Sequence, residues 1–186
     1  MICNISDEIK IENLMRDTEA ISQWERLSGS AEELEAFRYM EKAYSDLGYS
    51  TRLLFHDAYI SLPVNSSFKA DGRLFYSRTH SMSASTGRKA VKGEIVWISE
   101  ERLSLLQPGE LSGKLAAVDG RAVYSSVSWA EKAGALGVIC IQEDPVRECI
   151  PSASWGSPDR RSLNLIPGIP VISNRNFGRN RNRSGY

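Results

Sequence analysis

Residues 1–48 follow a helical pattern of hydrophobic positions. Apolar side chains recur at steps of three and four residues over 11–24, after the N-cap candidate Ser6, and this spacing predicts a first amphipathic helix. A capping-box pattern at 30–33 precedes a second apolar stripe over 34–47. We therefore expect two helices that form a hairpin over this part of the chain.

Beyond residue 48 the pattern changes to short apolar runs that are separated by turn signals, which predicts β-strands. Between two of these runs, Val127, Ala130 and Ala133 lie at helical spacing, so a strand, a helix and a strand are expected in that order. The polar and small residues of 81–88 predict a mobile loop. The predicted strands cover residues 51–55, 59–62, 74–76, 94–98, 115–118, 138–141 and 169–172.

Several motifs in a fixed order carry a resemblance to a known family. The segments 111–120 and 129–144, with Ser-Gly-Lys before the first strand and Ala-Gly-Ala-Leu-Gly-Val-Ile at the end of the helix, resemble the protease-associated domain, a small module inserted in several peptidases. With its flanks, the match over residues 6–173 resembles the N-terminal part of co-catalytic zinc aminopeptidases, metallopeptidase family twenty-eight. The flanking motifs are Trp24–Glu33, Asp57–Pro63, Trp155–Pro158 and Ile169–Val171.

The resemblance implies an α/β fold class with three regions. Residues 1–48 correspond to a helical hairpin that belongs to the peptidase domain in the family. Residues 49–173 correspond to the protease-associated domain, a mixed β-sheet or barrel-like sandwich with flanking helices. Residues 174–186 alternate Arg and Asn, which predicts a disordered tail. The sequence departs from the family pattern at about Asn174. A truncated or frame-shifted gene would produce such a departure.

The same resemblance bears on catalysis. Peptidases of this family hold two zinc ions through a His-x-Asp pair, a Glu-Glu pair, a further acidic residue and a distant His, all downstream of the inserted domain. Here His56 and His80 are the only histidines, and neither lies in a His-x-Asp frame. We therefore expect no catalytic residue, no metal site and no cofactor in this chain, with zinc belonging to the full-length family. The alternative is that the chain is a subunit of a split or full-length zinc metallopeptidase.

Two other arrangements of reactive residues lack the required spacing. His56 and Asp57 are neighbours on a predicted strand and would point to opposite faces, which excludes the geometry of a hydrolytic triad. Cys140 and Cys149 are separated by more residues than the close cysteine pairs of structural zinc sites, so we do not expect them to bind zinc together with His56 and His80. Cys140 is expected to be a buried packing residue.

The loop that contains Trp155, Ser157 and Pro158 is the candidate contact site for a peptide or partner protein. Large aromatic residues in loops are typical contact points, and in the family this loop is positioned to face the active site. The other interpretation is that Trp155 folds back over the core of the module. The sequence leaves both interpretations open.

Charge and composition restrict the partners. Basic and acidic side chains number 23 each, so the formal net charge is zero and neither nucleic acid nor membrane is expected as a partner. The expected partner is a peptide or a protein such as a peptidase catalytic domain. In the family the equivalent of the 1–48 hairpin packs on that domain, so we also expect its exposed stripes to associate two copies of the chain.

Targeting signals and cysteine content bear on location. No apolar run approaches the roughly 20 residues of a membrane span, and the N-terminus has no basic segment followed by an apolar one. The three cysteines form an odd set, which fits a reducing compartment. These features predict a cytoplasmic location.

Overall fold

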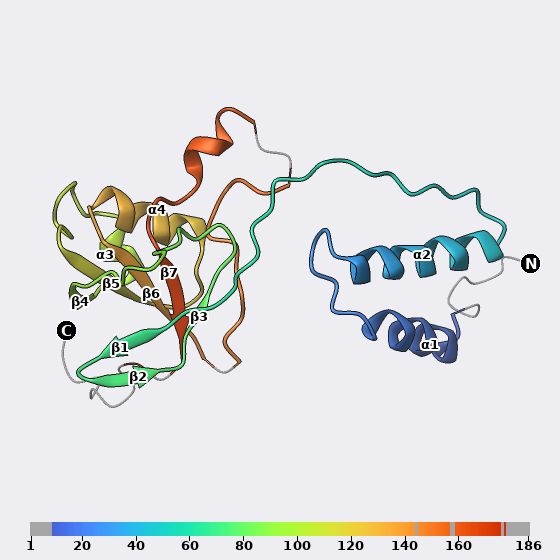
Figure 1. Ribbon diagram of the computed structural model, residues 1–186, viewed down its shortest axis with the longest axis horizontal. Coiled ribbons are helices and arrows are strands. Elements are labelled where there is room, and N and C mark those ends of the chain that lie inside the picture. Colours follow the sequence, from blue (N-terminus) through green and yellow to red (C-terminus); the bar gives the residue numbers. More distant parts are fainter. Residues whose placement is uncertain (1–8, 144, 157–158, 176, 178–186) are drawn as a thin grey trace, which may run out of the picture. The chain divides into compact units, whose positions relative to one another are not determined.

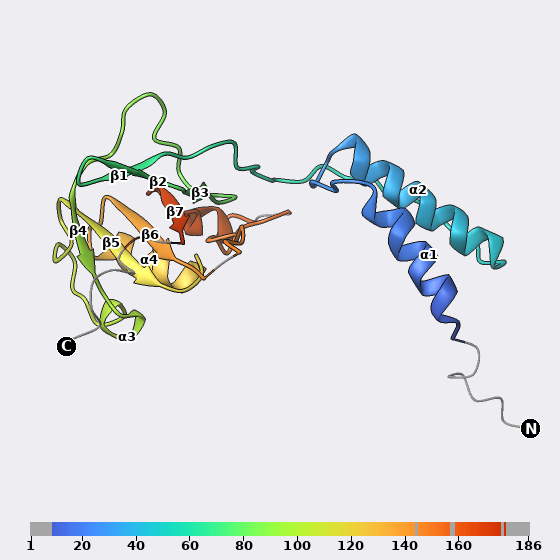
Figure 2. The ribbon, with the colours of Figure 1, turned by 90° about the horizontal axis from the view of Figure 1, so that it is seen from below.

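The computed structural model describes residues 9–143, 145–156, 159–175 and 177 (Figures 1 and 2). The chain divides into two compact units, Met1–Ala58 and Tyr59–Tyr186. No helix of the described residues has the length and the apolar character that crossing a membrane requires.

The first helix, α1, spans Ile11–Ser22 and is shorter at both ends than the pattern predicted. Ile9 and Lys10 precede it without helical structure, and Lys10 makes no side-chain cap hydrogen bond. The predicted N-cap Ser6 lies outside the described residues. None of the α1 side chains is buried, so its apolar stripe is open.

The second helix, α2, spans Ala31–Asp46 and begins at the predicted capping box. The Ser30 hydroxyl accepts a hydrogen bond from the Glu33 backbone N–H at 3.0 Å. The Glu33 carboxylate in turn accepts from the Gly29 N–H at 2.7 Å. These two bonds satisfy backbone donors that the helix itself leaves unpaired, which explains why the helix begins here.

Few contacts hold the two helices together. The Tyr39 hydroxyl donates to Asp17 at 2.9 Å, and the Tyr39 ring lies 6.3 Å from that of Trp24. Ala36 is the only buried side chain among the described residues of this unit. The hairpin predicted from the sequence is present, but it encloses almost no core.

The segment that follows α2 differs from the sequence prediction. Residues 49–58 form neither helix nor strand, so the strand expected at 51–55 is absent. The strand expected at 59–62 is reduced to one backbone bridge between Tyr59 and Gly156. An extended apolar run becomes a strand only when another strand pairs with it, and the described structure brings none to 49–58.

The second unit contains a five-stranded sheet in the order β3-β7-β6-β5-β4. Strands β4 to β7 are parallel, and β3 is antiparallel to β7. This arrangement confirms the α/β class and the mixed sheet, but the sheet is open and not barrel-like. The strands are β3 Arg78–Thr79, β4 Glu94–Trp97, β5 Lys114–Asp119, β6 Gly137–Ile141 and β7 Val171–Asn174.

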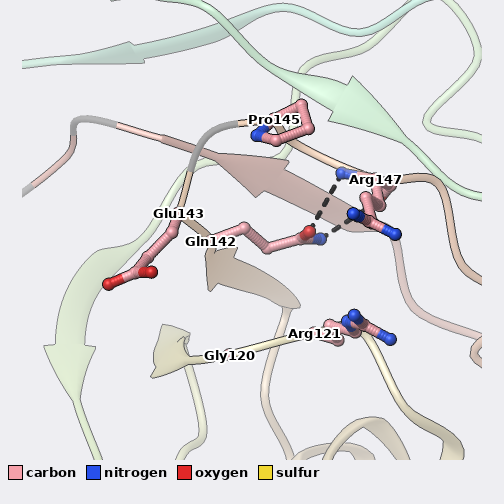
Figure 3. A pocket seen from close by; sticks show the side chains of 6 residues that line it. All are labelled: Gly120, Arg121, Gln142, Glu143, Pro145 and Arg147. Atoms are coloured by element: carbon pink, nitrogen blue, oxygen red, sulfur yellow. Dashed lines mark hydrogen bonds between the residues drawn. The ribbon is translucent and has the colours of Figure 1, made fainter.

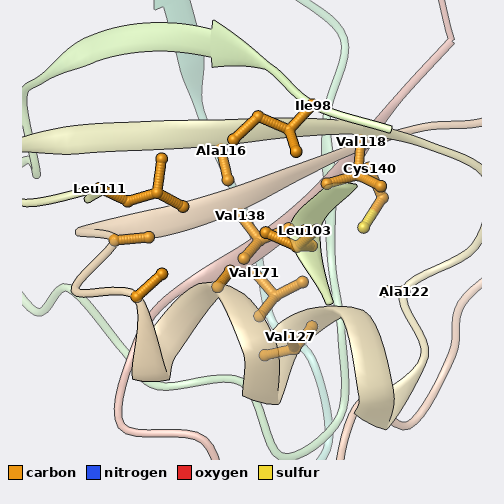
Figure 4. Close-up of a cluster of buried hydrophobic side chains, with 13 residues drawn as sticks. Ile98, Leu103, Leu111, Ala116, Val118, Ala122, Val127, Val138, Cys140 and Val171 are labelled. Atoms are coloured by element: carbon orange, nitrogen blue, oxygen red, sulfur yellow. The ribbon is translucent and has the colours of Figure 1, made fainter. Parts of the chain in front are cut away.

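Helices cover one face of this sheet (Figure 4). The short helix α3, Glu100–Leu103, connects β4 to β5, and α4, Tyr124–Lys132, connects β5 to β6. Val127 of α4 is fully buried against the alternate apolar residues of the strands, among them Val138. Cys140 belongs to the same core, which confirms its predicted packing role.

A small antiparallel hairpin, β1 Phe68–Ala70 and β2 Arg73–Phe75, makes up the second sheet of the unit. The Phe177 ring lies 5.1 Å from the ring of Phe68 and 5.4 Å from that of Phe75, and it stacks on Trp97 at 6.0 Å. Trp97 points to the side of the sheet opposite Val96, which packs against the helix-covered core. Aromatic rings therefore gather on the second face.

The start of the predicted tail is part of this unit. Asn174 is the last residue of β7 and is fully buried, and Phe177 belongs to the aromatic cluster. Residues 178–186 lie outside the described residues. The predicted loop at 81–88 forms no helix or strand, although Ser81 and Met82 at its start are buried.

Packing around β6 predicts the effect of one added methyl group. In Gly137→Ala the new Cβ lies 2.9 Å from the Pro170 carbonyl oxygen and 3.3 Å from a Leu115 methyl, so we expect a loss of about 1–3 kcal/mol of unfolding free energy, measured in urea. Gly168→Ala is the matched control, because its Cβ meets only the end of the flexible Glu131 side chain, which can rotate away at the cost of its hydrogen bond with the Gly168 N–H. Equal losses in both variants would contradict this packing.

Candidate functional site

A small cavity lies where the carboxyl ends of β5 and β6 meet (Figure 3). Its volume is about 250 Å³. In open α/β sheets, ligands commonly bind at this edge, because the loops that leave the strands lie together there. The residues that line the cavity are Gly120, Arg121, Gln142, Glu143, Pro145 and Arg147.

The buried amide of Gln142 fixes the loop that forms one wall. Its Nε2 donates to the Ser173 hydroxyl at 2.6 Å and to the Arg147 carbonyl at 3.1 Å. Its Oε1 accepts from the Arg147 N–H at 3.0 Å (Figure 3). A buried amide with both ends hydrogen-bonded holds its partners firmly, so the backbone of Arg147 is tied to β7.

His80 extends this network to the next part of the loop. Its Nδ1 accepts a hydrogen bond from the Cys149 backbone N–H at 3.1 Å, and its Nε2 lies 2.8 Å from the Ser173 hydroxyl. Because Nδ1 is an acceptor, the proton of the neutral ring is on Nε2, which donates to Ser173. Burial, and to a smaller extent the charge of Arg78, lowers the His80 pKa to about 4.

The side chains present do not fit the zinc that the resemblance implies for the full-length family. Both ring nitrogens of His80 are occupied by hydrogen bonds. Burial raises the pKa of the Cys140 thiol to about 12, which disfavours the thiolate that zinc requires. Exposed His56 belongs to the other unit, and Cys149 is half-buried. Over the described parts of the chain, no three His, Cys, Asp or Glu side chains gather as a metal site would need.

Of the predicted contact residues, the structure describes Trp155, which is half-buried and does not join the hydrophobic core. Its loop is held by two backbone hydrogen bonds between Tyr59 and Gly156, at 2.6 and 2.9 Å. Ser157 and Pro158 lie outside the described residues. Trp155 thus retains an accessible part, although its loop is anchored.

Sequence reasoning did not identify the arginines of the cavity. Arg121 and Arg147 follow the apolar runs that were predicted as strands at 115–118 and 138–141. The signal was available, because the residues that follow parallel strands gather at one edge of a sheet.

Searches against family models and against curated proteins found no match. Solved structures do match. An aminopeptidase from Aneurinibacillus sp. strain AM-1 has a TM-score of 0.59 and 22% identity, over 89% of this chain and 38% of its own. A zinc aminopeptidase from Bacillus subtilis has a TM-score of 0.55 and 19% identity, over 86% and 38%. A peptidase M28 precursor from Shewanella amazonensis SB2B has a TM-score of 0.52 and 16% identity, over 85% and 40%.

This chain has a fold seen in zinc aminopeptidases. It spans 38–40% of the length of these structures, consistent with the N-terminal part that the motifs predicted. The aminopeptidase-like fold therefore includes both the helical unit and most of the sheet unit, since the match covers 85–89% of the chain.

His80 predicts a pH dependence of stability. In the unfolded chain its pKa is near 6.5, whereas folding lowers the pKa to about 4, so the unfolded state binds more protons between these values. The stabilisation is complete above pH 6.5 and is lost as the pH falls toward 4, by about 3 kcal/mol. Urea unfolding at pH 7 and pH 4 measures it, and His80→Gln is expected to remove this component.

His56→Gln is the matched control, because this histidine is exposed and belongs to the other unit. It should keep the pH dependence of the unchanged protein. If His80→Gln and the unchanged protein lost the same free energy between the two pH values, the role given to His80 would be wrong.

Proposed function

We propose that this chain is a non-catalytic, N-terminal part of a zinc-aminopeptidase-like protein, and that its sheet unit is a protease-associated domain. In this role the helical unit packs against a peptidase catalytic domain. The sheet unit binds peptide or protein and shapes the access of substrates. The observation that carries the proposal is the open apolar surface of the helical unit.

Large hydrophobic side chains remain exposed along both helices. Leu14 of α1 is 56% exposed, and Phe37 and Tyr44 of α2 are 46% and 56% exposed. Burying such a side chain fully contributes roughly 1.5–3 kcal/mol, and isolated helices of this length are marginal in water. A helical pair whose only buried side chain is Ala36 therefore gains most of its stability from a surface that covers it.

The proposed partner of this surface is a peptidase catalytic domain. In its absence the same surface would associate two copies of the chain. The alternative role, a subunit of a split or full-length zinc metallopeptidase, uses the same surface. It differs in that the assembled complex would hydrolyse peptides with zinc ligands that come from the other part.

For the sheet unit, the loop around Trp155 is the proposed contact surface, together with Ser157 and Pro158. The backbone pairing of Tyr59 with Gly156 holds this loop, and 46% of Tyr59 is exposed. Anchored loops that present aromatic side chains lose little entropy on binding, which supports recognition of an extended peptide.

The first test of this role is peptide binding. We expect an unstructured, fluorescein-labelled peptide to bind the chain with saturable anisotropy, and we expect Trp155→Ala to weaken binding by about tenfold or more. Leu105→Ala is the matched control, because Leu105 is 75% exposed and lies outside this loop. Absence of saturable binding, or an equal loss in both variants, would contradict the proposal.

The second test concerns the helical unit. We expect sedimentation equilibrium to show reversible association of the isolated chain, and Phe37→Glu to shift the population to monomers, because a charge in an apolar interface costs free energy. Leu54→Glu is the control, since Leu54 is exposed outside the two helices. If the chain stayed monomeric at every concentration, α1 and α2 would not form a self-association surface.

A further inference from the structure

We propose that the cavity at the carboxyl ends of β5 and β6 binds the C-terminal carboxylate of a peptide, through Arg121 and Arg147. This inference rests on the peptide-binding role proposed above and names the chemical group that the sheet unit recognises. It concerns a site separate from the Trp155 loop.

The charges around the cavity favour an anion. Figure 3 shows the guanidinium groups of Arg121 and Arg147 on one side of the cavity, while the Glu143 carboxylate points to the other side. Within the described part of the chain, neither arginine takes part in an ion pair. Two neighbouring positive groups that form no ion pair with any described carboxylate attract an anion, and the planar guanidinium matches a carboxylate with two parallel hydrogen bonds.

Buried neighbours and hydrogen bonds anchor the backbone on either side of the cavity. The residues next to them, Ala122 and Val146, are buried in the unit, so the arginine side chains project outward from an anchored chain. The Gly120 N–H donates to the Ile141 carbonyl at 2.9 Å and joins the two walls. Anchoring of the backbone beside Arg121 and Arg147 lowers the entropic cost of recognition.

The size of the cavity favours the terminal group of a peptide over a longer peptide segment. Its volume of about 250 Å³ is below the roughly 300–1,000 Å³ of pockets that enclose a whole drug-sized ligand. It accommodates a carboxylate and the start of one residue, while the rest of the peptide stays outside. Pro145 forms a rigid part of the wall.

The experiment compares two peptides of one sequence, one with a free C-terminal carboxylate and one with a C-terminal amide, by fluorescence anisotropy on the full chain. We expect the free acid to bind about tenfold more tightly at low salt, and the difference to shrink as salt rises. Arg121→Gln and Arg147→Gln should each remove most of the difference. Arg88→Gln, an exposed arginine elsewhere in the unit, should leave it unchanged.

The other outcomes separate this inference from the function on which it rests. Equal binding of the acid and the amide, with a loss in Trp155→Ala, would overturn the carboxylate site and leave peptide binding intact. Failure of both peptides to bind would overturn both proposals. Inorganic phosphate and acetate would then be compared as competitors of the free-acid peptide. If the two anions displaced the peptide equally well, the cavity would be a general anion site, and the assignment to a peptide carboxylate would be wrong.

Discussion

The hydroxyl of Ser173 accepts hydrogen bonds from Gln142 and from His80, and the course of the chain beyond β6 depends on these two bonds. A buried polar group is costly unless it is paired, so each of the three side chains requires the others. Through Gln142 the network holds the backbone of Arg147, and through His80 it holds Cys149. The buried side chains of Ser173, Gln142 and His80 therefore fix the position of the loop that forms one wall of the candidate site.

Much of the sheet unit could be predicted from the sequence, because its central strands are short, β-branched runs between turn signals. The capping box of Ser30 and Glu33 could also be predicted from the sequence, since both residues lie within one helical turn. The predicted strand at 51–55 failed for a physical reason. Leu54 is 70% exposed, and no strand of the described residues pairs with this segment. Periodicity alone does not reveal whether a partner strand exists.

The network around Ser173 could not be predicted in the same way. His80 lies 93 residues from Ser173 and 69 from Cys149 along the chain, so no local pattern joins them. The alternating Arg and Asn residues around Phe177 predict a disordered tail, yet the Phe177 ring stacks on Trp97. Local composition describes a segment on average and misses a single anchoring side chain.

The two units of this aminopeptidase-like fold gain their stability differently. The sheet unit buries helices and strands against its own core, whereas the helical unit leaves its apolar stripes open. Burial within the helical unit itself therefore contributes little to the stability of α1 and α2.

The position of β7 in the sheet has a consequence for the order of folding. β7 lies between β3 and β6, although it is the last of the five strands of this sheet in chain order. During synthesis the edge of β6 therefore stays unpaired until Val171–Asn174 leaves the ribosome, and β3 has no partner until then. Sheets closed by such distant pairings form slowly, and their unpaired edges are the places where nascent chains aggregate. The sheet can be completed only once Val171–Asn174 has been synthesised.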